Sequence, residues 1–139
     1  MRKYLSWIMP IIIVLLSGCA GQPGEINANL GEHFSLAIGQ SASITGENLK
    51  IHFIEVVGDS RCPQGVTCIW AGEASSLIEI TYSKSTYRKV LTQPGLSEPP
   101  QTDFQQYKIT FDLLPYPREG ERIESKDYRL QLEISRKAG

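Results

Sequence analysis

The sequence predicts an all-β domain, a small antiparallel sandwich or barrel of about six to eight strands with one disulfide inside the domain. Three observations lead to this prediction. From position 33 onward, apolar and polar residues alternate in short runs, which is typical of strands that bury one face. Connections rich in Gly, Pro and Ser separate the runs. No window between 33 and 139 shows the 3.6-residue period of an amphipathic helix.

Alternating runs at 34–38 and 49–53 predict the first strands of the domain. The alternation fails within 54–57, which predicts either a β-bulge or a segment buried on both faces. The next two runs flank a Ser-Lys-Ser turn candidate at 83–85. We therefore expect a hairpin over 74–92.

A polar, proline-rich connection at 93–103 separates this hairpin from the last two strands, which alternating runs at 107–113 and 128–134 predict. Between these strands the segment 114–120 contains two prolines, which cannot donate to a β-ladder and so end the earlier strand. The connection at 93–103 is a candidate recognition loop, because binding residues concentrate in loops held by a scaffold. An ordinary solvated connection is the alternative.

The first 18 residues resemble the signal peptide of a bacterial lipoprotein. Arg2 and Lys3 precede an apolar run from Leu5 to Leu16, which is shorter than the roughly 20 residues that span a bilayer. The segment Leu16-Ser17-Gly18-Cys19 is similar to a lipobox. This resemblance implies cleavage before Cys19 and attachment of lipid chains, such as palmitate, to its sulfur and to the new amino terminus. Two or more acyl chains give a stable membrane anchor.

The resemblance divides the chain into a signal peptide (1–18), a lipidated cysteine with a flexible tether (19–32), and a single β domain (33–139). The tether is assigned because its residues are small and polar without an apolar period. Ala20 after the cysteine, in place of Asp, implies export to the outer membrane in an organism that has one. We therefore expect a lipid-anchored protein of the cell envelope.

The charge of the chain argues against a nucleic-acid partner. Without Arg2 and Lys3 the chain carries 12 basic and 15 acidic residues, a net charge of −3, and it has no clustered excess of basic residues. We expect a monomer attached to the membrane through Cys19. Its expected ligand is another envelope protein or a glycan, and we expect neither a cofactor nor a metal.

The segment GDSRCPQGVTCIWAGEA at 58–74 contains two cysteines, three glycines, a proline and a tryptophan. No other segment of the sequence is so rich in residues with special conformational or packing requirements. Once Cys19 is assigned to lipid, Cys62 and Cys68 remain as an even pair in an oxidising compartment, where disulfides persist. Five residues separate them, which fits neither a CxxC redox motif nor half of a zinc site. A disulfide between them closes a short loop, worth about 2.4 kcal/mol on chain-entropy grounds.

Asp59, Arg61 and Trp70 are the candidate binding residues of this segment. Asp59 and Arg61 flank a turn, so they either stabilise that turn or contact a partner. Trp70 lies two residues after Cys68, and an extended chain would point both side chains to one face. We expect Trp70 to pack over the disulfide and into the core. The alternative is an exposed stacking platform for a ligand.

The same segment carries a family resemblance. The string DSRCP at 59–63, followed by CIWAGEA at 68–74, is similar to a signature of small bacterial lipoproteins and secreted proteins without an established activity. LPYP at 114–117 and DYRL at 127–130 fit the same pattern. The resemblance covers most of the mature domain. It implies one β domain and no catalytic residue.

These observations favour a binding or accessory module over an enzyme. The motifs GxSxG, HExxH and SxxK are absent from the sequence. One alternative is a metal- or redox-handling protein that uses Cys62 and Cys68 with His33 or His52. Another is an inhibitor of an envelope-directed enzyme, by analogy with small disulfide-containing β lipoproteins that inhibit lysozyme.

Overall fold

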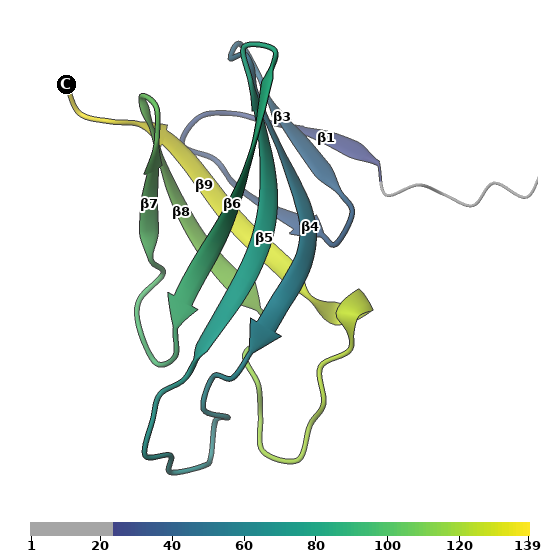
Figure 1. The fold of residues 1–139 in the computed structure, drawn as a ribbon, viewed down its shortest axis with the longest axis vertical. Coiled ribbons are helices and arrows are strands. Elements are labelled where there is room, and N and C mark those ends of the chain that lie inside the picture. The colour runs from purple at the N-terminus through teal and green to yellow at the C-terminus, as the bar shows by residue number, and fades with distance from the viewer. Residues whose placement is uncertain (1–23) are drawn as a thin grey trace, which may run out of the picture.

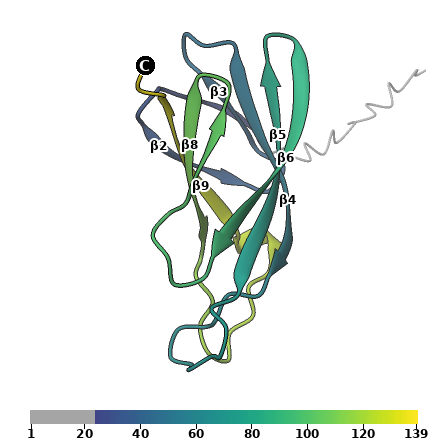
Figure 2. The same cartoon turned by 60° about the vertical axis from the view of Figure 1, so that its left-hand side comes forward.

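The computed structural model describes residues 24–139, which form two β-sheets packed face to face (Figures 1 and 2). One sheet has the strand order β1-β3-β4-β5-β6 and the other has the order β2-β9-β8-β7. The predicted signal peptide (1–18) and Cys19 lie outside the described residues. The elements are β1 (Glu25–Ala28), β2 (His33–Ala37), β3 (Ser41–Ile44), β4 (Leu49–Asp59), β5 (Glu73–Tyr82), β6 (Ser85–Pro94), β7 (Gln101–Phe104), β8 (Tyr107–Leu114), the 3₁₀ turn η1 (Ser125–Asp127) and β9 (Arg129–Arg136).

This architecture confirms the predicted all-β class and its Cys62–Cys68 disulfide, and it is a sandwich rather than a barrel. β5 and β6 form the predicted hairpin, and Ser83 and Lys84 make its turn. β4 has the predicted irregularity, because its register against β5 shifts twice within 53–58. The alternating pattern therefore located the long central strands correctly.

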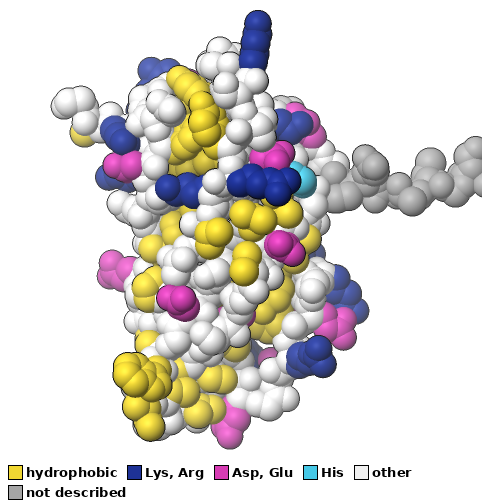
Figure 3. Space-filling model, viewed as in Figure 1, with side chains coloured by type: hydrophobic (Ala, Val, Ile, Leu, Met, Phe, Trp, Pro, Cys, Tyr) yellow, Lys and Arg dark blue, Asp and Glu magenta, His cyan; other side chains and the backbone are white. Residues whose placement is uncertain are grey.

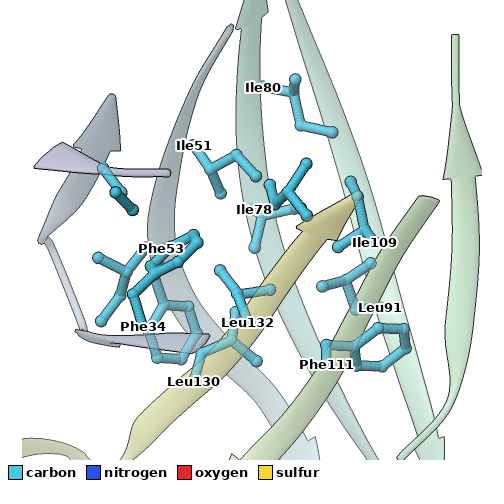
Figure 4. Close-up of a cluster of buried hydrophobic side chains, with 14 of the residues drawn as sticks. Phe34, Ile51, Phe53, Ile78, Ile80, Leu91, Ile109, Phe111, Leu130 and Leu132 are labelled. Carbon is cyan, nitrogen blue, oxygen red and sulfur yellow. The ribbon is translucent and has the colours of Figure 1, made fainter. Parts of the chain in front are cut away.

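The core lies between the two sheets and consists of the inward-facing members of each alternating run. Figure 4 shows Ile78 of β5 and Leu132 of β9 converging from opposite sheets, and both side chains are fully buried. Burial of one such side chain stabilises a fold by about 1.5–3 kcal/mol. This gain is what fixes which face of each strand points inward.

One polar link also joins the two sheets. Gln93, a buried residue of β6, donates from Nε2 to Asp112 Oδ1 at 2.6 Å and accepts at Oε1 from the backbone N–H of Leu113 at 2.7 Å. Both partners belong to β8. Because the buried amide is satisfied on both sides, it holds the end of β6 at a fixed place against β8.

The structure corrects the predicted boundary between tether and domain. Residues 25–28, assigned to the flexible tether (19–32), form β1, which pairs in parallel with β3. Ala28 is buried, and the carboxylate of Glu25 accepts a hydrogen bond from Lys50 Nζ at 2.5 Å. A four-residue strand is too short to show an alternating pattern. For the same reason the sequence did not predict β3 or β7 as separate strands.

Three connections meet at one end of the sandwich: residues 60–72, 95–100 and 115–128. Together with Asp59 and Glu73, the strand residues that flank the first connection, they form what we call the tip. In Figure 1 the tip is the lower end, and β1 begins toward the other end. Within residues 24–139 there is no helix of the length and hydropathy needed to cross a bilayer.

The hairpin turn gives a first test of the fold. Ser83 and Lys84 have φ values of 45° and 74°, the left-handed conformation that two-residue hairpin turns require and that glycine adopts without strain. We expect Lys84→Gly to raise the free energy of unfolding by about 0.5–1 kcal/mol, measured by urea denaturation. Thr86→Gly, at the second residue of β6, should lower the free energy of unfolding. A Lys84→Gly variant less stable than the natural chain would contradict this description of the turn.

Candidate functional site

The tip is built around a buried ion pair. The side chain of Arg61 is fully buried, and it donates from Nε to Asp59 Oδ1 at 2.8 Å and from Nη2 to Asp59 Oδ2 at 2.7 Å. This two-point geometry matches the planar guanidinium to the carboxylate. Neither group faces the solvent, so the structure favours the turn-stabilising interpretation of Asp59 and Arg61 over contact with a partner.

The same guanidinium connects this turn to the far side of the tip. Arg61 Nη1 donates to the carbonyl oxygen of Leu113 at 2.6 Å, and Nη2 donates to that of Pro115 at 3.1 Å. The ring of Tyr116 lies 4.8 Å from the guanidinium carbon, within reach of a cation–π contact. Tyr128, just before β9, donates its hydroxyl to Asp59 Oδ2 at 3.0 Å. The ion pair therefore joins the ends of β4, β8 and β9.

The surroundings of the pair shift two pKa values. Burial alone would raise the pKa of the Asp59 carboxyl, but the hydrogen bonds and charge of Arg61 outweigh burial and lower it. Burial, together with the negative charge and hydrogen bond of Asp59, raises the pKa of Tyr128 to about 12. Asp59 is thus an anion at neutral pH, and Tyr128 keeps the proton that it donates.

Two glycines let the backbones of the tip approach closely. Gly72 has a φ of 69°, and a Cβ there would lie 1.8 Å from the carbonyl oxygen of Ser60. A Cβ on Gly95 would lie 2.1 Å from the carbonyl oxygen of Ala71. The Gly95 N–H donates to the Gly72 carbonyl at 2.8 Å, and the Cys62 N–H donates to the Ala71 carbonyl at 2.8 Å. Only residues without a side chain permit this contact between the two loops.

The disulfide closes the remaining part of the loop. Cys62 and Cys68 are bonded to each other, with their Cα atoms 6.0 Å apart. Cys62 is buried, whereas Cys68 is exposed at the surface of the tip. While the cysteines are joined, neither offers a thiolate to a metal or a redox partner, as the metal- and redox-handling alternative requires.

The histidines do not come together with this cysteine pair. His33 lies on β2, where it contacts Glu133 at 3.2 Å, and His52 lies on β4 in the other sheet. Within 24–139, no three His, Cys, Asp or Glu side chains are grouped closely enough to hold a metal ion. The described part of the chain therefore offers no observation that favours a metal centre.

The outer surface of the tip is apolar and exposed. Ile69 is 94% exposed, Trp70 is 82% exposed and Leu96 is 72% exposed. This finding corrects the expectation that Trp70 packs into the core. Residues 60–72 form an irregular loop, so the strand geometry that would have placed Trp70 and Cys68 on one inward face does not apply. The alternative, an exposed platform, is what the structure has.

Trp70 and Leu96 line a hollow of about 410 Å³ that has no charged residue in its wall. Figure 3 shows apolar side chains gathered at this lower end of the molecule. Leu96 belongs to the proline-rich connection, so the two loops form one surface. The sequence singled out Trp70 and that loop separately, and nothing in the pattern signalled that Gly72 and Gly95 bring them together. The hollow is lined by Cys62, Val66, Thr67, Cys68, Trp70, Ala71 and Leu96.

Comparisons with known protein families, with curated proteins and with solved structures found no match to this chain. The family resemblance of the string at 59–74 therefore stays a prediction. The function has to be argued from the site itself.

Replacement of Arg61 tests the buried ion pair. Lysine keeps the charge but cannot make the two-point contact with Asp59 while also donating to two backbone carbonyls. A buried acceptor left without its donor costs about 1–3 kcal/mol. We expect Arg61→Lys to lower the free energy of unfolding by an amount in that range, measured by urea denaturation. Arg118→Lys, at an exposed position of the tip, should change it by less than about 0.5 kcal/mol. Equal effects of the two would contradict the assigned role.

The pH dependence of stability gives a second test of the pair. The folded-state pKa of Asp59 is lowered, so its stabilising effect is present above the unfolded-state pKa of about 3.9 and is lost as the pH falls through the folded-state value. We expect the difference in unfolding free energy between the natural chain and Asp59→Asn to be large at pH 5 and to shrink by pH 2. A difference independent of pH would show that ionised Asp59 does not contribute.

Proposed function

We propose that this chain is a lipid-anchored protein of the cell envelope whose β domain is a binding module, with the tip as its contact surface. The observation that carries the proposal is the neighbouring pair Ile69 and Trp70, 94% and 82% exposed, of which Trp70 also lines the uncharged hollow. Burial of large apolar side chains against a partner is worth about 1.5–3 kcal/mol each. A monomeric domain gains nothing from leaving such a pair in water, so its exposure favours a role in binding.

The rigid attachment of the loop that carries Ile69 and Trp70 also supports binding. Three restraints hold this loop in place: the Cys62–Cys68 disulfide, the close contact at Gly72 and the hydrogen bonds of Arg61. A contact surface that is already in place loses little conformational entropy on association. Tryptophan is also enriched among the residues that dominate binding energy at protein interfaces. Trp70 is therefore the residue on which we expect affinity to depend most.

The anchor is proposed from the lipobox resemblance at Cys19. Five residues, 20–24, separate that cysteine from the start of β1. An extended chain spans about 3.5 Å per residue, so the tether would hold the start of β1 within roughly 20 Å of the bilayer surface. A module anchored in this way meets partners at or near the membrane rather than throughout the compartment.

Photo-crosslinking in the native host tests whether the tip contacts a partner. We would replace Ile69 with a photoreactive amino acid in the full chain and look for crosslinked species of discrete mass. The matched control is Val90, which is 51% exposed on β6 and lies outside the tip. We expect products from position 69 only. A domain that yields none from position 69, or the same products from both positions, would overturn the proposed function.

Substitution of the exposed tryptophan should separate binding from folding. Because Trp70 is exposed, we expect Trp70→Ala to change the free energy of unfolding by less than about 0.5 kcal/mol. The same substitution should reduce the crosslinking yield from position 69 by about tenfold or more, as for a residue that dominates an interface. A large loss of stability would instead assign Trp70 a structural role.

The proposed anchor predicts how the chain partitions between cell fractions. In the native host, Cys19→Ala should abolish incorporation of labelled palmitate and move the protein out of the membrane fraction, because no acyl chain would then be attached. Cys68→Ala serves as the control, because it removes a cysteine without touching the lipobox. Palmitate labelling that survives Cys19→Ala would exclude the anchor while leaving the tip as a binding surface.

A further inference from the structure

The tip carries the entire net charge of the described domain. The buried Asp59 and Arg61 neutralise each other, which leaves six exposed acidic and three exposed basic residues in the tip. The rest of 24–139 has eight acidic and eight basic residues and is neutral overall. The exposed charges of the tip are Glu73, Glu98, Glu119, Glu121, Glu124 and Asp127 against Arg118, Arg122 and Lys126.

Three of these carboxylates, Glu73, Glu98 and Glu119, lie near the apolar surface in space or in sequence, and none lines the hollow. A Cβ on Gly65, next to the hollow residue Val66, would lie 3.7 Å from a carboxylate oxygen of Glu119. Glu98 follows Leu96 in the same short connection, and Glu73 follows the Gly72 contact. The uncharged hollow thus belongs to a tip whose exposed charges sum to −3.

The wall of the hollow discriminates between ligand classes. Its only side-chain hydroxyl belongs to Thr67, and the rest of the wall is aliphatic, aromatic or disulfide. A glycan offers many hydroxyl groups, which need several polar side chains for orientation. A large apolar side chain needs none. The hollow therefore fits an aliphatic or aromatic side chain better than a sugar.

The negative charge of the tip further restricts the class of partner that can bind. Lys126 pairs with Glu124 at 2.9 Å, and the exposed charges of the tip still sum to −3, so anionic lipid headgroups would be repelled and Lys and Arg side chains on a protein would be attracted. The tip also lies away from the start of β1, where a chain anchored at Cys19 enters the domain (Figure 1). Both observations favour a protein over the bilayer surface as the occupant.

We propose that the tip binds a basic segment of another protein, which inserts one large apolar side chain into the hollow lined by Trp70 and Leu96. The proposal rests on the proposed binding function and adds the chemistry of the partner. The apolar contact supplies most of the affinity. The carboxylates increase the association rate and exclude acidic segments, and their contribution falls as salt concentration rises.

Selection from a random peptide library tests this chemistry without knowledge of the natural partner. The target is the oxidised fragment 24–139, which contains every described strand and the whole core. Phage that bind the fragment are passed over Trp70→Ala, and those that no longer bind are sequenced. We expect these peptides to carry a net positive charge and at least one Leu, Ile, Phe or Trp.

Binding constants of the selected peptides then separate the two parts of the proposal. Trp70→Ala should weaken binding by about tenfold or more, and Glu98→Gln with Glu119→Gln should weaken it several-fold at low salt and little at high salt. Glu55→Gln, at an exposed position of β4 outside the tip, is the matched control and should have no effect. Selected peptides that are neutral or acidic would overturn the proposal, and so would a failure to select any Trp70-dependent peptide.

A vesicle experiment distinguishes a membrane as the occupant. Trp70 is the only tryptophan of fragment 24–139, so its emission reports on the tip alone. We expect no blue shift with phosphatidylglycerol or phosphatidylcholine vesicles, and a shift with either would replace the protein partner by a bilayer. If position 69 gives crosslinks in cells while the library gives no basic peptides, the binding function stands and this inference fails. If neither gives a product, both fail.

Discussion

The buried guanidinium of Arg61 is the constraint on which the tip depends. It donates to both oxygens of the Asp59 carboxylate and to the backbone carbonyls of Leu113 and Pro115 at and just after the end of β8, so one side chain joins two separate parts of the chain. If the guanidinium were lost, the carbonyls of Leu113 and Pro115 would lose this donor, and Asp59 would keep only the hydrogen bonds from Tyr128 and from the Arg61 backbone. The turn after β4, the turn after β8 and the chain entering β9 are therefore held in one arrangement.

This constraint explains how one segment combines two properties that usually conflict. Arg61 and Cys62 are buried, whereas Ile69 and Trp70 are exposed to solvent only a few residues later. A loop with so much exposed apolar surface would collapse onto the sheet if its backbone were free to move. The disulfide and the close contact at Gly72 prevent this. The stabilising contacts are concentrated at the base of the loop, and Ile69 and Trp70 in its outer part stay exposed.

The alternating pattern of the sequence was sufficient to predict the class of fold, the central strands, the β5–β6 hairpin and the bulged part of β4. The pattern could not predict β1, β3 or β7, because four residues do not establish a period. The inward position of Arg61 was also beyond it, since the carbonyls that receive the guanidinium lie more than 50 residues away. Trp70 was predicted to face the core because every second side chain of a strand points to the same face, and this rule does not apply in an irregular loop. Short strands, irregular loops and long-range contacts are therefore the three features that the alternating pattern does not encode.

The pairing of β1 has a consequence for how the domain bears load. In a chain anchored at Cys19, tension on the anchor enters the domain at Glu25 and reaches the sheet through the four-residue pairing of β1 with β3. Rupture there would free a few residues and lengthen the tether while β2 to β9, the hollow and the ion pair of Arg61 remain intact. The β1–β3 pairing would thus break first under tension. The lengthened tether would then relieve the load on a chain bound through the tip before the remaining strands are strained.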